Sequence, residues 1–163
     1  MLVIIEGADG TGKTTLVEKL RSEGYVSVCI PKNTPCIFGV YKQLIYNSKA
    51  TDFVIDRSFI TDIVYRLVLD GQPSFNLNAI ACLLSEDMKI IYCTNDNSFN
   101  YAKERGEDLI CERETHNKIC KVYEYVMKCI SIFANKKILK YDFEKMNFED
   151  VLKFIKQEEE VIQ

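Results

Sequence analysis

Several features that would indicate a membrane protein or a nucleic-acid-binding protein are missing from the sequence. No apolar run reaches the ~18 residues that a membrane span requires, and no basic stretch follows Met1 as it would in a secretory signal. The 163 residues carry 21 Lys and Arg against 24 Asp and Glu, a net charge of −3. Such a chain has no general positive field for a nucleic-acid backbone, so we expect no extended nucleic-acid surface and only local anion sites.

The seven cysteines lack the spacing of a metal site, because they include no C-x-x-C pair. Their odd number also argues against a complete set of disulfides. Most lie in apolar stretches, as Cys29 and Cys93 do, and we therefore expect reduced thiols in the core of a cytoplasmic protein. The single histidine, His116, has no recognisable partner base or metal-ligand set, and we expect it to be an exposed polar residue.

The length and the hydrophobic pattern predict one α/β domain over residues 1–163. Apolar runs rich in β-branched residues predict five strands, at residues 2–5, 25–30, 53–55, 89–93 and 137–141. Helical spacing of apolar residues lies between and after these runs, and the stripe from Ile119 to Phe133 predicts core packing or part of a dimer face. Strands separated by helices require right-handed crossovers, so we expect a parallel sheet with helices on both faces.

The motif with the clearest chemistry is a complete G-x-x-x-x-G-K-[ST] sequence at residues 7–14, between a strand and an amphipathic helix. Its glycines let backbone N–H groups curl around a polyphosphate, and the helix behind it presents its positive end to the anion. Lys13 is expected to reach the β- and γ-phosphates of ATP, and the Thr14 hydroxyl to ligate Mg²⁺. We therefore predict a P-loop NTPase fold. The predicted donor-binding residues are Gly7, Gly10, Thr11, Gly12, Lys13, Thr14 and Thr15.

A second candidate feature, Asp56-Arg57-Ser58, follows the third predicted strand. Ligands gather beyond the carboxyl ends of strands in an open α/β sheet, so this segment is expected near the glycine-rich loop. Asp56 can hold Mg²⁺ through water, and the Arg57 guanidinium can take phosphate oxygens bidentately. The alternative is a surface Asp–Arg pair followed by a capping Ser58.

A third candidate feature is the charged run K-E-R-G-E-D at residues 103–108, which follows the fourth predicted strand. Cations on a lid can close over the phosphates and exclude water during transfer, and we place such a lid at residues 100–114, with Arg105 as its cation. A solvated charged turn would have the same composition, so the prediction depends on the position of the run in the chain order.

Together these segments resemble those of thymidylate kinases. Residues 5–15 closely resemble the E-G-x-D-G-x-G-K-T-T opening of that family, and residues 56–57 resemble its D-R-[YH] motif. Tyr65 resembles the tyrosine of its A-Y-Q segment, and residues 105–108 resemble its R-G-E-x-D lid. The resemblance implies a nucleoside monophosphate kinase-like fold, with Asp9 between the donor and the acceptor sugar. It also implies a homodimer.

The chain departs from the thymidylate kinase pattern mainly between the second and third predicted strands. The family sequence R-E-P-G-G-T is replaced by P-K-N-T-P at residues 31–35, and the base-recognising helix is shortened. Lys32 is left as a cation for the acceptor phosphate, and Phe38 or Tyr41 as the aromatic that stacks on the acceptor base. Ser58 stands where the family has an aromatic residue. These departures leave the base specificity open.

The leading hypothesis is a nucleoside monophosphate kinase that converts ATP and a (deoxy)nucleoside monophosphate, foremost dTMP, into ADP and the diphosphate. Because the phosphoryl group moves in line between two bound phosphates, catalysis is mainly positioning and charge neutralisation. The predicted catalytic residues are Lys13, Asp9, Arg57 and Arg105. The predicted acceptor-binding residues are Asp9, Lys32, Phe38, Arg57 and Tyr65, and the predicted Mg²⁺ ligands are Thr14 and Asp56.

Other functions stay open at this point. Deoxynucleoside kinases carry E-R-S where this chain has Asp56-Arg57-Ser58, but their hydroxyl acceptor needs a general base near the end of the second strand. Here that strand is followed by Lys32, a cation, which suits a phosphate acceptor instead. Another small-molecule kinase or a polynucleotide 5′-hydroxyl kinase is a further alternative. A nucleotide-gated switch would hydrolyse ATP without an acceptor.

Overall fold

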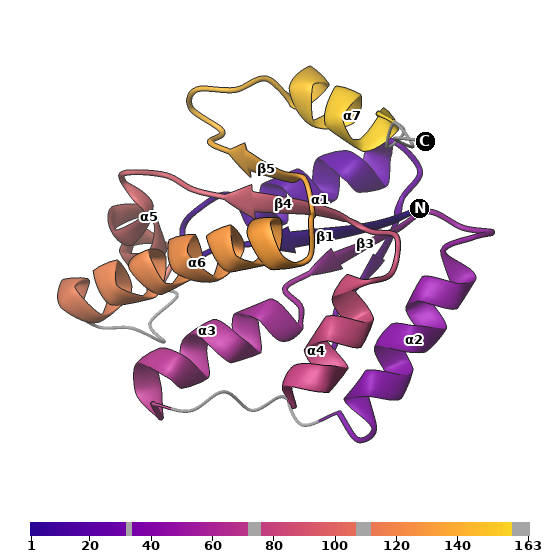
Figure 1. Ribbon diagram of the computed structural model, residues 1–163. Helices are drawn as coiled ribbons and strands as arrows, with labels where there is room; N and C mark the ends of the chain where they lie inside the picture. Colours follow the sequence, from indigo (N-terminus) through magenta and orange to yellow (C-terminus); the bar gives the residue numbers. More distant parts are fainter. Residues whose placement is uncertain (32–33, 72–75, 107–111, 158–163) are drawn as a thin grey trace.

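The computed structural model describes residues 1–31, 34–71, 76–106 and 112–157. It contains a parallel sheet of five strands in the order β2-β3-β1-β4-β5 (Figure 1). The strands are β1 (Leu2–Glu6), β2 (Val26–Val28), β3 (Phe53–Asp56), β4 (Lys89–Cys93) and β5 (Ile138–Tyr141). The predicted α/β fold with a five-stranded parallel sheet is therefore confirmed.

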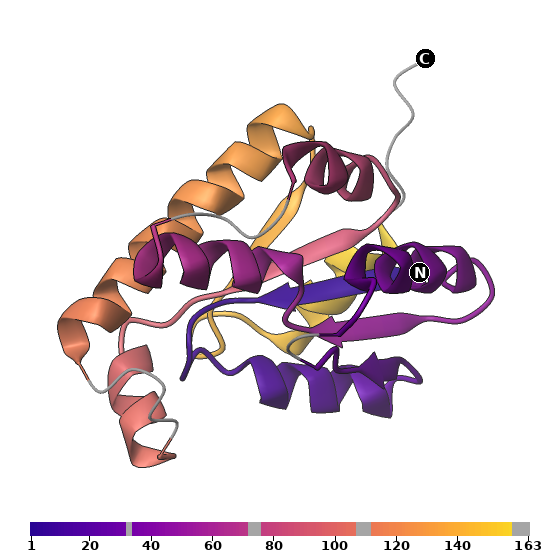
Figure 2. The same ribbon diagram turned by 90° about the horizontal axis from the view of Figure 1, so that it is seen from below.

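Helices cover both faces of the sheet, as Figures 1 and 2 show. One face packs against α1 (Lys13–Ser22) and α7 (Phe148–Lys156). The other face is covered by α2 (Ile37–Asn47), α3 (Phe59–Leu69), α4 (Leu77–Leu84) and α6 (Arg113–Phe133). A short helix that the sequence does not predict, α5 (Ser98–Glu104), follows β4 and lies beside the first turns of α6.

The central strand β1 shows why the sequence pattern predicts a strand covered on both sides. All five of its residues are buried. Leu2 and Ile4 belong to the core shared with α3 and α6, whereas Val3 and Ile5 belong to the core shared with α1 and α7. Successive side chains of a strand point to opposite faces, so a strand that is covered twice is a continuous apolar run.

The register of the parallel strands brings three chain segments together at one edge of the sheet. Ile5 of β1 pairs with Asp56 of β3, and Glu6 pairs with Tyr92 of β4. The chain therefore leaves these three strands at nearly the same height. Because ligands bind beyond the carboxyl ends of parallel strands, this edge is where a site is expected.

The edge strand β2 is shorter than predicted. It spans Val26–Val28, whereas the sequence predicts a strand over residues 25–30, and it pairs with β3 alone. With one neighbour instead of two, its ladder ends at Val28, opposite Ile55. Cys29 follows directly and is exposed. The expectation that Cys29 is a core thiol is therefore wrong.

Other expectations about burial are also corrected. Cys36 and Cys82 are exposed as well, and Cys93 is the one fully buried cysteine in the part of the chain that the structure describes. Phe133, expected to continue the apolar stripe of α6, is 86% exposed because it is the last residue of that helix. The rest of the stripe is confirmed as core, since Ile119, Tyr123, Val126 and Ile130 are all buried. Across the described ranges, no helix combines the length and the apolar character needed to cross a membrane.

Candidate active site

The glycine-rich loop at residues 7–12 has the shape of a phosphate cradle. Gly10 has a φ of 75°, and a β-carbon there would lie 1.9 Å from the carbonyl oxygen of Ser98. Gly12 has a φ of 82° and precedes the first residue of α1 without any side-chain cap. The free N–H groups of this helix start and its positive dipole end are therefore available to an anion.

Lys13 lies across this loop. Its side chain is buried, and its Nζ donates a hydrogen bond to the carbonyl oxygen of Ala8 at 2.5 Å. Burial lowers the pKa of Lys13, and the nearby Arg57 charge lowers it further, whereas Asp9 opposes the shift. A buried cation of this kind is stabilised by an incoming polyphosphate, which adds opposite charge to that of Asp9.

The predicted threonines of the loop divide into two groups. Thr14 and Thr15 are exposed in the first turn of α1, where a hydroxyl is free to meet a ligand. The Thr11 hydroxyl is buried and donates to the Ala8 carbonyl at 2.8 Å. Its side chain therefore braces the loop from inside, and a phosphate at this position would meet its backbone.

Asp56 ends β3 beside the phosphate loop. Its Oδ1 atom is buried and has no hydrogen-bond partner in the described structure, and its charge acts on Lys13. A buried carboxylate oxygen without a donor is costly unless a cation or water is bound to it. The pair Asp56 and Thr14 therefore fits a Mg²⁺ ion, which typically takes one or two protein oxygens together with substrate phosphates and water.

Arg57 is held by residues from two other segments. Its guanidinium donates a hydrogen bond to the Asp9 carboxylate, and it lies 6.0 Å from the ring centre of Tyr65. The Tyr65 hydroxyl donates to the other Asp9 oxygen at 3.2 Å. The Asp9 side chain is 4% exposed and that of Arg57 is 34% exposed. The cation is thus anchored at its base and open to solvent beside the phosphate loop.

The charge state of this cluster follows from its geometry. Burial alone would lower the pKa of Arg57, but the Asp9 carboxylate more than compensates and raises it above its ordinary value. Burial also raises the pKa of the Tyr65 hydroxyl, and Asp9 raises it further. Arg57 is therefore a permanent cation, and Tyr65 is a neutral hydrogen-bond donor.

Not all predicted residues join this cluster. Phe38 is half-buried against the main core, and Tyr41 is fully buried with its ring edge on Phe59, so Tyr41 is a core residue. Arg105 is exposed and directly follows the last residue of α5. Ser98 begins that helix, so about 10 Å along the helix axis separates the two residues. Lys32 and residues 107–111 of the predicted lid lie outside the described residues.

Comparison with solved structures shows which known proteins share this fold. No known protein family matches the sequence, and no curated protein is similar to it in sequence. The YorR protein of Bacillus subtilis, solved in complex with phosphorylated GDP, has a TM-score of 0.72 and 20% identity, covering 95% of this chain and 93% of its own. Deoxyadenosine kinase from M. mycoides, with dCMP and dCDP bound, has a TM-score of 0.62 and 18% identity, covering 95% and 96%. Thymidylate kinase from Candida albicans has a TM-score of 0.59 and 16% identity, covering 94% and 88%.

The chain has the fold of the P-loop nucleotide kinases. The suspected likeness to such kinases is thereby confirmed at the level of the fold. At these identities the comparison leaves open which acceptor is used, because the fold hosts several related chemistries.

Within this P-loop nucleotide kinase fold, Glu6 is a residue whose role the sequence does not predict. It is fully buried at the end of β1, and its carboxylate accepts hydrogen bonds from the Ser58 N–H at 2.7 Å, the Ser58 hydroxyl at 2.6 Å and the Thr61 hydroxyl at 2.6 Å. Ser58 in turn caps α3 by accepting from the Ile60 N–H at 3.2 Å. Glu6 thus ties the segment that carries Arg57 to the phosphate-loop strand. The sequence signal that could have indicated this role is a carboxylate residue, Glu6, directly after the aliphatic run at residues 2–5.

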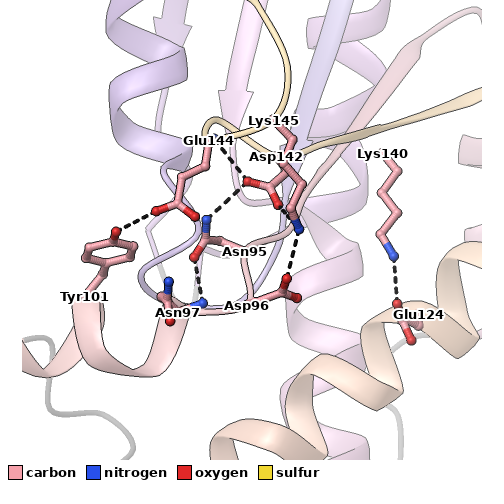
Figure 3. A network of polar contacts seen from close by, with 9 residues as sticks. All are labelled: Asn95, Asp96, Asn97, Tyr101, Glu124, Lys140, Asp142, Glu144 and Lys145. Atoms are coloured by element: carbon pink, nitrogen blue, oxygen red, sulfur yellow. Dashed lines mark hydrogen bonds and ion pairs between the residues drawn. The ribbon is translucent and has the colours of Figure 1, made fainter.

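A network of polar contacts joins the loops after β4 and β5 (Figure 3), and these loops lie against Gly10 and Gly12 of the phosphate loop. The Asn95 amide donates to the Asp142 carboxylate at 3.1 Å, and Lys145 makes ion pairs with Asp142 at 3.0 Å and with Asp96 at 2.8 Å. These contacts hold the ring of Phe143 against Gly12, where a β-carbon would lie 2.7 Å from it. No sequence motif predicts this network, because its two loops lie far apart in the chain and are brought together by the pairing of β4 with β5.

A cavity of about 430 Å³ lies between this network and α6. It is bordered by the phosphate loop at Ala8 and Thr11, and its far side is formed by Lys121 and Glu124 of α6. Lys140 of β5 and Glu124 form an ion pair at its border, with 2.8 Å between their charged atoms. Because Ala8 and Thr11 are part of the phosphate loop, the cavity adjoins the same site.

His116 corrects another expectation. It is not exposed: it lies in the first turn of α6, is 2% exposed, and its Nε2 is 2.9 Å from the hydroxyl oxygen of Ser98. The local sequence is polar, and an exposed side chain is the ordinary outcome for such a stretch. Here α5 folds over the beginning of α6 and covers the imidazole, which no local pattern indicates.

Proposed function

We propose that the protein is an ATP-dependent (deoxy)nucleoside monophosphate kinase with thymidylate as its first expected acceptor. The observation that carries this proposal is the position of Arg57, a fixed and partly open cation beside a complete phosphate loop. A cation at that place suits an acceptor that arrives with its own phosphate group.

The donor side is supported by the phosphate loop. The N–H groups at the start of α1, which no side chain caps, and the buried Lys13 cation would bind the β- and γ-phosphates of ATP. Thr14 and Asp56 would hold Mg²⁺, which neutralises phosphate charge when it is bound. Residues of the first turn of α1 therefore contact the donor, while Asp56 faces it from β3.

The acceptor side is supported by the Arg57 cluster. A monophosphate brings about two negative charges, and the guanidinium fork can meet two phosphate oxygens at once. Asp9 and Tyr65 would fix the orientation of that fork. With Lys13 on the donor and Arg57 on the acceptor, an oxygen of the acceptor phosphate can attack the γ-phosphorus in line. The bond from that phosphorus to the β-bridging oxygen breaks, and ADP leaves with its electrons.

A deoxynucleoside kinase is the second candidate. It is favoured by the fold shared with the deoxyadenosine kinase from M. mycoides and by the Asp56-Arg57-Ser58 sequence. A nucleoside acceptor has to lose a hydroxyl proton, so a free carboxylate base is needed. Among the carboxylates around the phosphate loop in the described structure, Glu6 is engaged with Ser58 and Asp9 with Arg57, and Asp56 is the one assigned to Mg²⁺. This arrangement favours the monophosphate acceptor.

An ADP-release assay with matched acceptors tests the proposal. Purified protein is supplied with ATP and Mg²⁺, and then with thymidine, dTMP, dCMP, dGMP or dAMP in separate reactions. We expect ADP release to depend on a monophosphate, with the diphosphate as the second product in chromatography. Faster turnover of thymidine than of dTMP would establish the nucleoside kinase instead. ATP hydrolysis that is independent of any acceptor would indicate a nucleotide-gated switch.

A further inference from the structure

One buried titratable group lies beside the phosphate loop and has no part in the proposed reaction. His116 of α6 and Ser98 of α5 are 2% and 3% exposed, and 2.9 Å separates the imidazole Nε2 from the Ser98 hydroxyl oxygen. The ring of Phe99 packs edge-on against the imidazole, with 5.6 Å between the ring centres. The thiol of Cys120, one turn further along α6, lies near the Ser98 hydroxyl; burial raises the pKa of this thiol, and the hydroxyl lowers it in part. The contact with His116 therefore ties Ser98 of α5 to α6.

The backbone of the same serine supports the phosphate loop. A β-carbon on Gly10 would lie 1.9 Å from the Ser98 carbonyl oxygen and 2.8 Å from the backbone nitrogen of Ala102. The first turn of α5 is therefore in direct backbone contact with the loop. A shift of Ser98 by even a fraction of an ångström changes the space available to Gly10, because close-packed groups transmit such displacements.

We propose that His116 is a positioning residue for the phosphate loop. Its neutral imidazole, bonded to the Ser98 hydroxyl, keeps α5 at the place where the Ser98 backbone holds Gly10 in its donor-binding conformation. This role rests on the proposed function, since it assumes that the loop binds the phosphates of ATP or ADP. It adds to that function a residue that touches neither substrate.

The neutral state of His116 follows from its surroundings. Burial lowers its pKa, and the charges of Lys13 and Arg113 lower it further, whereas Asp9 acts in the opposite direction. In the neutral ring one nitrogen can accept a hydrogen bond from the Ser98 hydroxyl, whereas a protonated ring can only donate, so protonation would reverse this bond. Protonation would also place a second buried cation close to Lys13. We therefore expect this arrangement to hold at neutral pH and to be disrupted as the pH falls below the ordinary histidine range.

Direct binding of ADP separates this role from a general effect on folding. Wild-type protein and the variants Ser98→Ala and His116→Leu are titrated with a fluorescent ADP analogue, and the midpoint of thermal unfolding is measured for each. Ser48→Ala is the matched control, because Ser48 is also a buried serine but bonds to the Ile45 carbonyl of α2 at 2.8 Å, away from the loop. His116→Gln is the conservative variant, because its amide can reach the position of Nε2.

We expect ADP affinity to fall about tenfold in Ser98→Ala and His116→Leu, and to be largely retained in His116→Gln and Ser48→Ala. The affinity of the wild type should also weaken from pH 7 to pH 5 more steeply than that of His116→Gln. If folded Ser98→Ala binds ADP as the wild type does, the positioning role is refuted while the proposed function stands. If the wild type itself does not bind ADP, the proposed function fails and this role fails with it.

Discussion

The guanidinium of Arg57 is hydrogen-bonded to the carboxylate of Asp9, which joins the turn after β3 to the phosphate loop after β1. Arg57 also has a backbone φ of 66°, a left-handed conformation that costs a non-glycine residue about 1–2 kcal/mol. The Arg57 N–H donates to the Ile5 carbonyl at 3.0 Å, so both its backbone and its side chain are bonded to β1 or its loop. These contacts offset the strain and give the cation a fixed position.

The first prediction concerns the acceptor. Arg57→Lys keeps the charge but loses the bidentate fork, so the KM for the monophosphate should rise while the KM for ATP stays nearly constant. Arg57→Ala should lower kcat/KM for the monophosphate by about 10²–10³-fold, as is typical for the loss of one transition-state contact. Steady-state kinetics with both substrates measure this. Arg66→Lys, an exposed arginine of α3 paired with Asp62, is the control. A variant of Arg57 that raised only the KM for ATP would move this residue to the donor side.

The second prediction concerns Lys13. Lys13→Ala should reduce phosphoryl transfer by at least about 10²-fold, because the cation that meets the β- and γ-phosphates is lost. Its folding should be unimpaired, since burial of this charge is unfavourable without a ligand and lowers its pKa. Calorimetry and the ADP-release assay are run together, with the exposed Lys19 of the same helix changed to alanine as a control. Near-normal turnover by folded Lys13→Ala would contradict the donor assignment.

The third prediction concerns Mg²⁺. Asp56→Asn removes the charge of a half-buried carboxylate whose buried Oδ1 lacks a donor among the described residues. The Mg²⁺ concentration for half-maximal activity should rise about tenfold, and the thermal midpoint should not fall, because no ion pair is broken. Asp70→Asn, at the exposed end of α3, serves as the control. Full wild-type activity in excess chelator would exclude the metal role.

The fourth prediction concerns the acceptor base. With Tyr41 in the core, Phe38 is the remaining aromatic candidate on α2. If its ring stacks on the base, Phe38→Ala should change the relative kcat/KM among dTMP, dCMP and dGMP, because stacking depends on the size of the base. Phe38→Leu, which keeps the apolar volume without the ring, separates stacking from packing. An unchanged order of acceptors in Phe38→Ala assigns the residue to the core.

The fifth prediction concerns stability and pH. Burial raises the pKa of Glu6, although its hydrogen bonds to Ser58 and Thr61 lower it in part. A carboxyl that holds its proton more tightly when folded stabilises the protein at low pH, and this contribution is lost as the pH rises through the folded pKa. From about pH 5 to pH 8, the free energy of unfolding of the wild type should therefore fall relative to that of Glu6→Gln.

Denaturant unfolding at a series of pH values measures this difference. In Glu6→Gln the amide oxygen can still accept from Ser58, and the amide nitrogen can donate to the Thr61 hydroxyl, so the fold should persist. Glu18→Gln, an exposed site on α1, should give a curve parallel to that of the wild type. Parallel curves for Glu6→Gln as well would show that Glu6 has the same protonation in both states.

The parts predicted correctly from the sequence depend on local patterns. The buried strand β1 is a continuous apolar run, and the phosphate loop is a contiguous motif. Each of these depends on residues within a few positions of one another. Periodicity, glycine conformation and capping act over such distances, so they can be identified without the tertiary structure.

The parts that were wrong or unseen depend on segments far apart in the chain. Cys29 is exposed because β2 is an edge strand, and His116 is buried because α5 covers it, and neither fact has a local signature. The short helix α5 itself was not predicted.

The sequence alone therefore determined the sheet, the phosphate loop and the types of the residues around that loop. The tertiary structure decided how these residues contact one another, with Asp9 holding Arg57 across 48 positions of the chain and Glu6 bonded to Thr61 across 55. It also decided that Ser98, rather than any residue of the motif, supports Gly10. The physical reason is that burial and hydrogen bonding between distant segments are set by the packing of helices on a parallel sheet, and local sequence patterns carry no record of those partners.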